Sequence, residues 1–255
     1  MGGRGGSSHR VGGGGGNVQN QDFANARAFL ERTYGAAHAN AILAMLGNAP
    51  SYVQEMWAEY GDLFRAARDR SNSSDAYYSP AEDRVHLGIA NVARGDSIHP
   101  PYATIYHEYG HMTDYLIART MGHGNYTAYS ETYKNGLLGR TAKKELEGHL
   151  NRFMQNNMTR TQAAEALARE ARSKYSMLDR SDISDMMEGA GIGIAYPLSS
   201  GHGLSYWNSR DNGKEIFAEI TSAEVAHPGS LKAIKDYFPE TYQVFQQMVK
   251  ERKKR

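Results

Sequence analysis

Cysteine is absent from this chain of 255 residues, and its absence excludes several kinds of chemistry. Disulfide bonds, thiolate metal sites and cysteine nucleophiles all require it, so any metal ion must be held by His, Asp or Glu. Long apolar runs are absent too. None approaches the roughly 18 residues that a membrane span needs, and the N-terminus lacks the apolar segment of a secretion signal. We therefore expect a protein that is cytoplasmic as made and has no membrane partner.

An excess of charge of one sign is also lacking. The 29 basic residues are balanced by 28 acidic residues, so the composition does not indicate a nucleic-acid partner. The basic run over residues 250–255 is interpreted as a solvated helix end, because cations interact favourably with the C-terminus of a helix. A nucleic-acid-binding module that acts through this run is the weakest of the alternatives.

Glycine is concentrated at the N-terminus, where residues 1–16 contain nine glycines and show no apolar periodicity. Such a segment cannot offset the entropy of ordering, so we predict a flexible Gly-rich leader over residues 1–20. The remaining residues, 21–255, are long enough to bury one sizeable core. We predict that they form a single α+β domain that is mostly helical and has a small sheet.

Apolar residues recur at helical spacing over residues 22–47 and 51–70, which predicts two helices. Residues 76–79 and 84–89 flank a turn and are predicted to form a β-hairpin in which alternate side chains face opposite ways. A short edge strand beside a metal-binding helix could pair with an extended peptide, or the hairpin could be purely structural. Residues 122–195 are predicted to be a helical insertion that either lines a cleft or braces the fold.

The segment around His107 is the one place where spacing implies chemistry. It contains the pattern H-E-x-x-H, with Glu108 beside the first histidine and His111 as the second, in a stretch predicted to be helical over residues 102–120. Histidines four apart project from one helix face and can hold one ion, for which zinc is the natural choice. A water on such a zinc has a pKa of about 7, and Glu108 is placed to take its proton. A chance match on a helix with two histidines is the alternative.

The third metal ligand must lie further along the chain. The pattern H-E-x-x-H-x-x-G-x-x-H is excluded, because Asp114 stands at its glycine position and Ile117 at its last histidine position. The best candidate is Glu215, which shares a helix face with Glu219, so one carboxylate would bind the metal and the other would orient the histidines. Two glutamates at this spacing are also common on solvated faces. Asp114 could orient the ring of one of the metal-binding histidines or could face solvent.

A glycine-rich segment, residues 201–207, contains two further candidates. Its glycines permit close approach of the backbone, and His202 and Tyr206 could donate hydrogen bonds to a developing oxyanion. His202 could instead replace Glu215 as the third ligand. Both residues could also be structural.

The order of these motifs resembles a known family. H-E-Y-G-H-x-x-D, then Ser-Tyr, then E-x-F-A-E is similar to the zinc peptidase domain of the anthrax lethal factor type, a gluzincin with a zincin-like fold. The resemblance implies two histidine ligands, a glutamate base, a tyrosine that helps to stabilise the oxyanion and a glutamate as third ligand. These roles fall on His107, His111, Glu108, Tyr206 and Glu215, with Glu219 supporting the histidines. The tyrosine lies slightly further from the third ligand than in the family, and the stretch before that ligand is longer.

A second resemblance covers residues of about 75 to 250. Ser184-Asp185-Met186-Met187, the segment Gly201 to Trp207, E-x-F-A-E and Tyr237-Phe238-Pro239-Glu240-Thr241-Tyr242 follow one another as in zincin-like toxin domains of phage and mobile-element head-morphogenesis proteins. This resemblance implies association with a virion or delivery into a target cell. The partners that it implies are phage structural proteins or a cognate inhibitor.

The sequence therefore predicts a zinc-dependent endopeptidase acting on a protein or peptide substrate, as a phage or mobile-element toxin or effector. The rival prediction is a zincin fold without catalytic activity that serves as a structural or interaction module of a phage particle.

Overall fold

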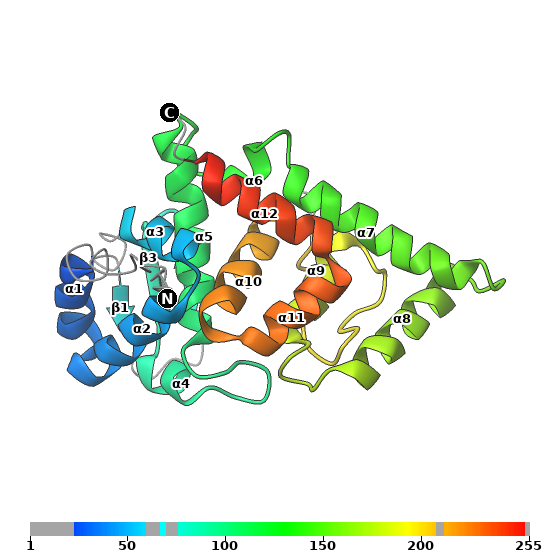
Figure 1. The fold of residues 1–255 in the computed structure, drawn as a ribbon, viewed down its shortest axis with the longest axis horizontal. Coiled ribbons are helices and arrows are strands. Elements are labelled where there is room, and N and C mark those ends of the chain that lie inside the picture. The colour runs from blue at the N-terminus through cyan, green and yellow to red at the C-terminus, as the bar shows by residue number, and fades with distance from the viewer. Residues whose placement is uncertain (1–22, 60–66, 70–75, 208–211, 253–255) are drawn as a thin grey trace, which may run out of the picture.

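The computed structural model describes residues 23–59, 67–69, 76–207 and 212–252. Over these residues the chain is mostly helical and has one small sheet, as predicted (Figure 1). The elements, in chain order, are α1 (Ala24–Tyr34), α2 (Ala36–Asn48), α3 (Ser51–Glu59), β1 (Ala67–Asp69), β2 (Tyr77–Ser79), β3 (Arg84–Leu87), α4 (Ile89–Arg94), α5 (Ala103–Thr120), α6 (Tyr129–Thr132), α7 (Leu137–Met154), α8 (Arg160–Lys174), α9 (Ser181–Ala190), α10 (Asn212–Ala226), α11 (Pro228–Tyr237) and α12 (Pro239–Glu251).

Helix α5, which carries the H-E-x-x-H pattern, lies between two groups of elements. In Figure 1 the sheet and α1 to α3 lie on one side of it, and α7 to α12 lie on the other. The predicted helix over residues 102–120 is confirmed, and it begins just after Pro100-Pro101. None of the helices in the described parts of the chain is long and apolar enough to cross a membrane.

The sheet has the strand order β1-β3-β2, so β2 is an edge strand. The predicted hairpin is confirmed, since β2 pairs with β3 in antiparallel fashion. Val85, His86 and Leu87 are all buried, because β3 is the central strand and both of its faces are covered. One detail of the prediction was wrong. Ile89 belongs to α4 and not to the strand.

The N-terminal helices also differ from the prediction. The helix predicted over residues 22–47 is broken at Gly35, whose φ of 84° is the left-handed region that glycine adopts readily, so that α1 and α2 are separate. The helix predicted over residues 51–70 was wrong at residues 67–69. Residues 67–69 form β1, which pairs with β3 in parallel, and this long-range pairing overrides the local helical pattern. Residues 60–66 and the predicted leader lie outside the described parts.

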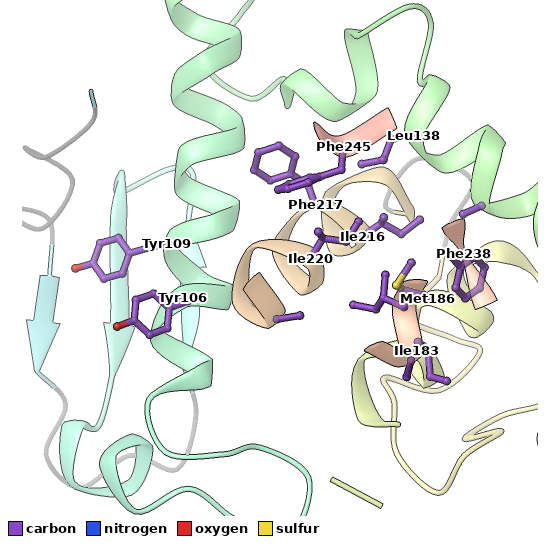
Figure 2. Close-up of a cluster of buried hydrophobic side chains, with 14 of the residues drawn as sticks. Tyr106, Tyr109, Leu138, Ile183, Met186, Ile216, Phe217, Ile220, Phe238 and Phe245 are labelled. Carbon is purple, nitrogen blue, oxygen red and sulfur yellow. The ribbon is translucent and has the colours of Figure 1, made fainter. Parts of the chain in front are cut away.

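Two faces of α5 are buried against different partners. Tyr106 and Tyr109 pack edge-on against Trp57 of α3, with ring centroids 5.7 and 6.0 Å away, and Figure 2 shows both tyrosines pointing away from α10. Next to Tyr109 on α5, a Cβ atom added to Gly110 would lie 3.0 Å from Cα of Ala218 in α10. The backbones of α5 and α10 therefore approach closely, and this contact brings the two helices with the candidate ligands together.

The three helices predicted within residues 122–195 are confirmed as α7, α8 and α9. Leu146 and Leu150 of α7 and Leu167 of α8 are fully buried, as their spacing predicted. Helix α9 packs against α10, and Figure 2 shows Ile183 and Met186 of α9 among the buried apolar side chains near Ile220 and its neighbours on α10. Helix α9 thus packs directly on the helix that carries the third candidate ligand.

Candidate metal centre

Three side chains from α5 and α10 converge on one point. Nε2 of His107 lies 3.1 Å from Nε2 of His111, and Oε2 of Glu215 lies 3.5 and 3.3 Å from these two nitrogens. Three ligands at about 2.0–2.2 Å around a tetrahedral zinc are separated from one another by about 3.3–3.6 Å. The three atoms are therefore spaced as a metal ion requires, and the group could hold one. His202 is not part of it, so the structure brings in Glu215 as the third candidate ligand.

The surroundings of the Oε2 atom of Glu215 also favour a metal site. It is buried and has no hydrogen-bond partner among the described residues. Burial raises the pKa of Glu215, but His111 and His107 outweigh this effect and hold the pKa well below its usual value. Burial lowers the pKa of His107, whereas Glu219 and Glu215 raise it well above its usual value. Without a metal, a proton on His107 balances the buried carboxylate, and a metal ion would displace it.

Two more acidic residues lie behind the ligands. Oε2 of Glu219 is 3.5 Å from Nδ1 of His107, which is where a carboxylate that orients this ring must lie. Burial raises the pKa of Glu219 to about 8.

Asp114 is fully buried, so a solvent-facing position is wrong. Its oxygens accept hydrogen bonds from N and Oγ of Ser130, at 2.8 and 2.5 Å, and Asp114 therefore fixes the start of α6 to the metal helix. Among the described contacts it has no hydrogen bond to the ring of His111.

The predicted base, Glu108, faces the edge strand. Its Oε2 accepts a hydrogen bond of 2.8 Å from the backbone N–H of Tyr78 in β2. The hairpin is in turn tied to α5, because Arg119 donates two hydrogen bonds to Asp83, at 2.6 and 3.1 Å, and one to the hydroxyl of Tyr78 at 3.1 Å. Glu108 in the first half of α5 and Arg119 near its end thus both bind the hairpin. These contacts fix the position of β2 relative to the predicted base.

An open cleft passes over the centre. It consists of two cavities of about 280 and 290 Å³ that share four lining residues, among them His107, Glu108 and His202. The first cavity is bordered by acidic side chains, which are Asp96, Asp182, Asp185 and Glu219. The second is bordered by tyrosines, which are Tyr77, Tyr78, Tyr115 and Tyr206. A bound chain would therefore meet different chemistry on the two sides of the metal centre.

His202 and Tyr206 reach this cleft from the loop between α9 and α10. The two rings are stacked, with centroids 4.2 Å apart, and the hydroxyl of Tyr206 donates a hydrogen bond of 2.5 Å to Oε1 of Glu215. The Nδ1 atom of His202 lies 2.9 Å from Oδ1 of Asp185. Burial lowers the pKa of His202, but Asp185, with smaller contributions from Glu215 and Glu219, raises it to about 9.

Three residues of the site could not be recognised from the sequence. Asp185 and Glu188 of α9 hold the loop that carries His202, yet acidic residues on an amphipathic helix normally indicate a solvated face. The role of Tyr78 depends on its backbone N–H, which has no sequence signal. The only indication in the sequence was that Asp185 belongs to the segment Ser184-Asp185-Met186-Met187, which is part of the second family resemblance.

No protein-family model matches the chain, and no curated protein or solved structure matches it.

Proposed function

We propose that the protein is a zinc-dependent endopeptidase of the gluzincin type. The observation that carries this proposal is the convergence of His107, His111 and Glu215 to zinc-like spacing, with Glu108 beside them on an open cleft. Two imidazoles and one carboxylate form a donor set that suits a catalytic zinc and leaves a position free for water.

Zinc held by these residues would supply a Lewis acid and a water that can be deprotonated at neutral pH. Glu108 would accept the proton of this water during attack on a peptide carbonyl and would pass it to the leaving amine. His202 borders both cavities and is the group that would donate a hydrogen bond to the developing oxyanion. Tyr206, whose hydroxyl contacts Glu215, would hold this ligand in place. The edge strand β2 would pair with the backbone of an extended substrate.

The wider biological setting is part of the proposal. The resemblance to zincin-like domains of phage and mobile-element proteins supports a toxin or effector, with phage structural proteins or a cognate inhibitor as partners. The rival function, a structural module of a phage particle, would retain the metal centre but would not turn over a substrate. A nucleic-acid-binding function would be steeply salt-dependent and indifferent to chelators.

The decisive experiment compares the protein with its Glu108→Gln variant in cell lysates, with new protein termini identified by mass spectrometry. The matched control is Glu165→Gln, which changes an exposed glutamate on α8. We expect new termini with the unmodified protein and the control, and none with Glu108→Gln, while all three bind one zinc ion. Equal cleavage by Glu108→Gln would show that the base is wrongly assigned. Zinc binding without cleavage by any of the three would favour the structural module.

A further inference from the structure

Glu188 is a buried carboxylate that the proposed mechanism does not use. It lies on α9 and is 2 % exposed. In the described parts of the chain no Lys, Arg or His forms an ion pair with it. A buried charge of this kind is costly unless hydrogen bonds compensate it, so its donors indicate what it is there to hold.

The three donors to Glu188 among the described residues all come from one loop. Oε1 accepts a hydrogen bond from the backbone N–H of Tyr196. Oε2 accepts one from the N–H of Gly203 at 2.9 Å and one from Nε1 of Trp207 at 3.0 Å. The loop over residues 196–207 is the segment that presents His202 and Tyr206 to the metal centre. Both oxygens of the carboxylate are thus used, and each hydrogen bond is charge-assisted.

Close packing on both sides supports a specific fit. A Cβ atom added to Gly201, whose φ is 132°, would lie 2.8 Å from Oε2 of Glu188. A Cβ atom added to Gly189, the next residue of α9, would lie 2.6 Å from the ring of Trp207. Side chains larger than hydrogen are excluded at both positions, because the loop lies directly on α9.

We propose that Glu188 is a positioning residue that fixes the loop over residues 196–207, so that Tyr206 reaches Glu215 and His202 reaches the cleft. This assignment rests on the proposed function for its catalytic meaning, but the contact between Tyr206 and Glu215 gives it a consequence for metal binding as well. A carboxylate is required, because a glutamine would turn an N–H₂ group toward one of the loop donors.

The test measures zinc affinity in a double-mutant cycle of Glu188→Gln and Tyr206→Phe, by competition with a chelator of known affinity. Groups that orient metal ligands typically contribute about 10- to 100-fold to metal affinity. We expect Glu188→Gln to weaken zinc binding about tenfold, at the lower end of this range. Because Glu188 acts through Tyr206, the double variant should bind zinc no more than about twofold more weakly than Tyr206→Phe alone.

Hydrogen exchange gives a readout that needs neither zinc nor turnover. Glu188→Gln should accelerate exchange at the amides of Tyr196 and Gly203, which donate to the carboxylate. The matched control is Glu145→Gln. Glu145 also accepts three hydrogen bonds, from N of Glu240 and from N and Oγ1 of Thr241, but it does so at the start of α12. The control should leave exchange in the loop and zinc affinity unchanged.

The proposal is overturned if Glu188→Gln leaves loop exchange unchanged, or if its effect on zinc affinity multiplies with that of Tyr206→Phe. Should Glu188→Gln fail to fold, Trp207→Phe removes the Nε1 donor and the part of the indole ring that packs on Gly189, but it keeps the backbone donors of Tyr196 and Gly203. It should then show a smaller change in the same two measurements. An absence of peptide hydrolysis by the unmodified protein would refute the proposed function, whereas exchange and zinc affinity would still decide the role of Glu188.

Discussion

The hydroxyl of Tyr206 could serve the metal ligand or the oxyanion, and Tyr206→Phe separates the two roles. In the structure Oη donates to Oε1 of Glu215, and the other oxygen of this carboxylate is the one that faces His107 and His111. The hydroxyl therefore restricts rotation of the ligand. We expect Tyr206→Phe to weaken metal binding.

The magnitude follows from a single hydrogen bond to an ionised group. Such bonds typically contribute about 1.5–3 kcal/mol. The side chain of Tyr206 is 44 % exposed, and water can replace its hydroxyl in the variant, which places the loss near the lower limit. A loss of about 1.5 kcal/mol of binding free energy corresponds to a roughly tenfold larger dissociation constant for zinc.

The assay is chelator competition at neutral pH, together with kcat on a cleaved peptide. His202→Phe is the matched variant, because it keeps a ring to stack on Tyr206 but removes the proposed oxyanion donor. It should lower kcat by about a hundredfold or more and leave zinc affinity unchanged. If Tyr206→Phe kept its zinc affinity within twofold and lost a hundredfold in kcat, Tyr206 would be the oxyanion donor and our assignment would be wrong.

Two further predictions concern the edge strand and the loop. Asp83→Asn weakens the paired hydrogen bonds from Arg119 that fix the hairpin. Because the pair is partly exposed, KM for an extended peptide should rise by no more than about fivefold, with zinc content unchanged; a loss of zinc would contradict this. Asp185→Asn tests the raised pKa of His202. Since this pKa is about 9 in the fold against a usual 6.5, the stabilisation is complete below about pH 6.5 and disappears as the pH rises through about 9. In chelated protein the Tm deficit of the variant should therefore be largest near pH 6 and vanish by about pH 10, and a deficit that grows with pH would refute it.

Helix α5 could be predicted because the residues that specify it are close together in the sequence. Spacing places His107 and His111 on one face, and Pro100-Pro101 mark the start of the helix. Glu215 was only a candidate, since a pair of glutamates four apart has the same pattern on a solvated face. What distinguishes it is the packing of α5 on α10, which buries Glu215 against the two histidines.

The parts that could not be predicted depend on contacts between distant residues. Strand β1 has a helical local pattern and becomes a strand only because β3 lies beside it. Glu188 is an ordinary acidic residue until the loop folds over it. The hydrogen bond from Tyr78 to Glu108 involves a backbone group that every residue except proline possesses.

The two positions marked x in H-E-x-x-H each meet a packing requirement in this molecule. Tyr109 fills the space beside Trp57, and Gly110 is the point at which the backbones of α5 and α10 touch. A single methyl group at position 110 would act as a wedge between the helix with two ligands and the helix with the third. A protein that shares this architecture is therefore expected to have an aromatic residue followed by glycine between Glu and the second His of the pattern. A chain that matches only the His and Glu positions would have to place its third ligand in another way.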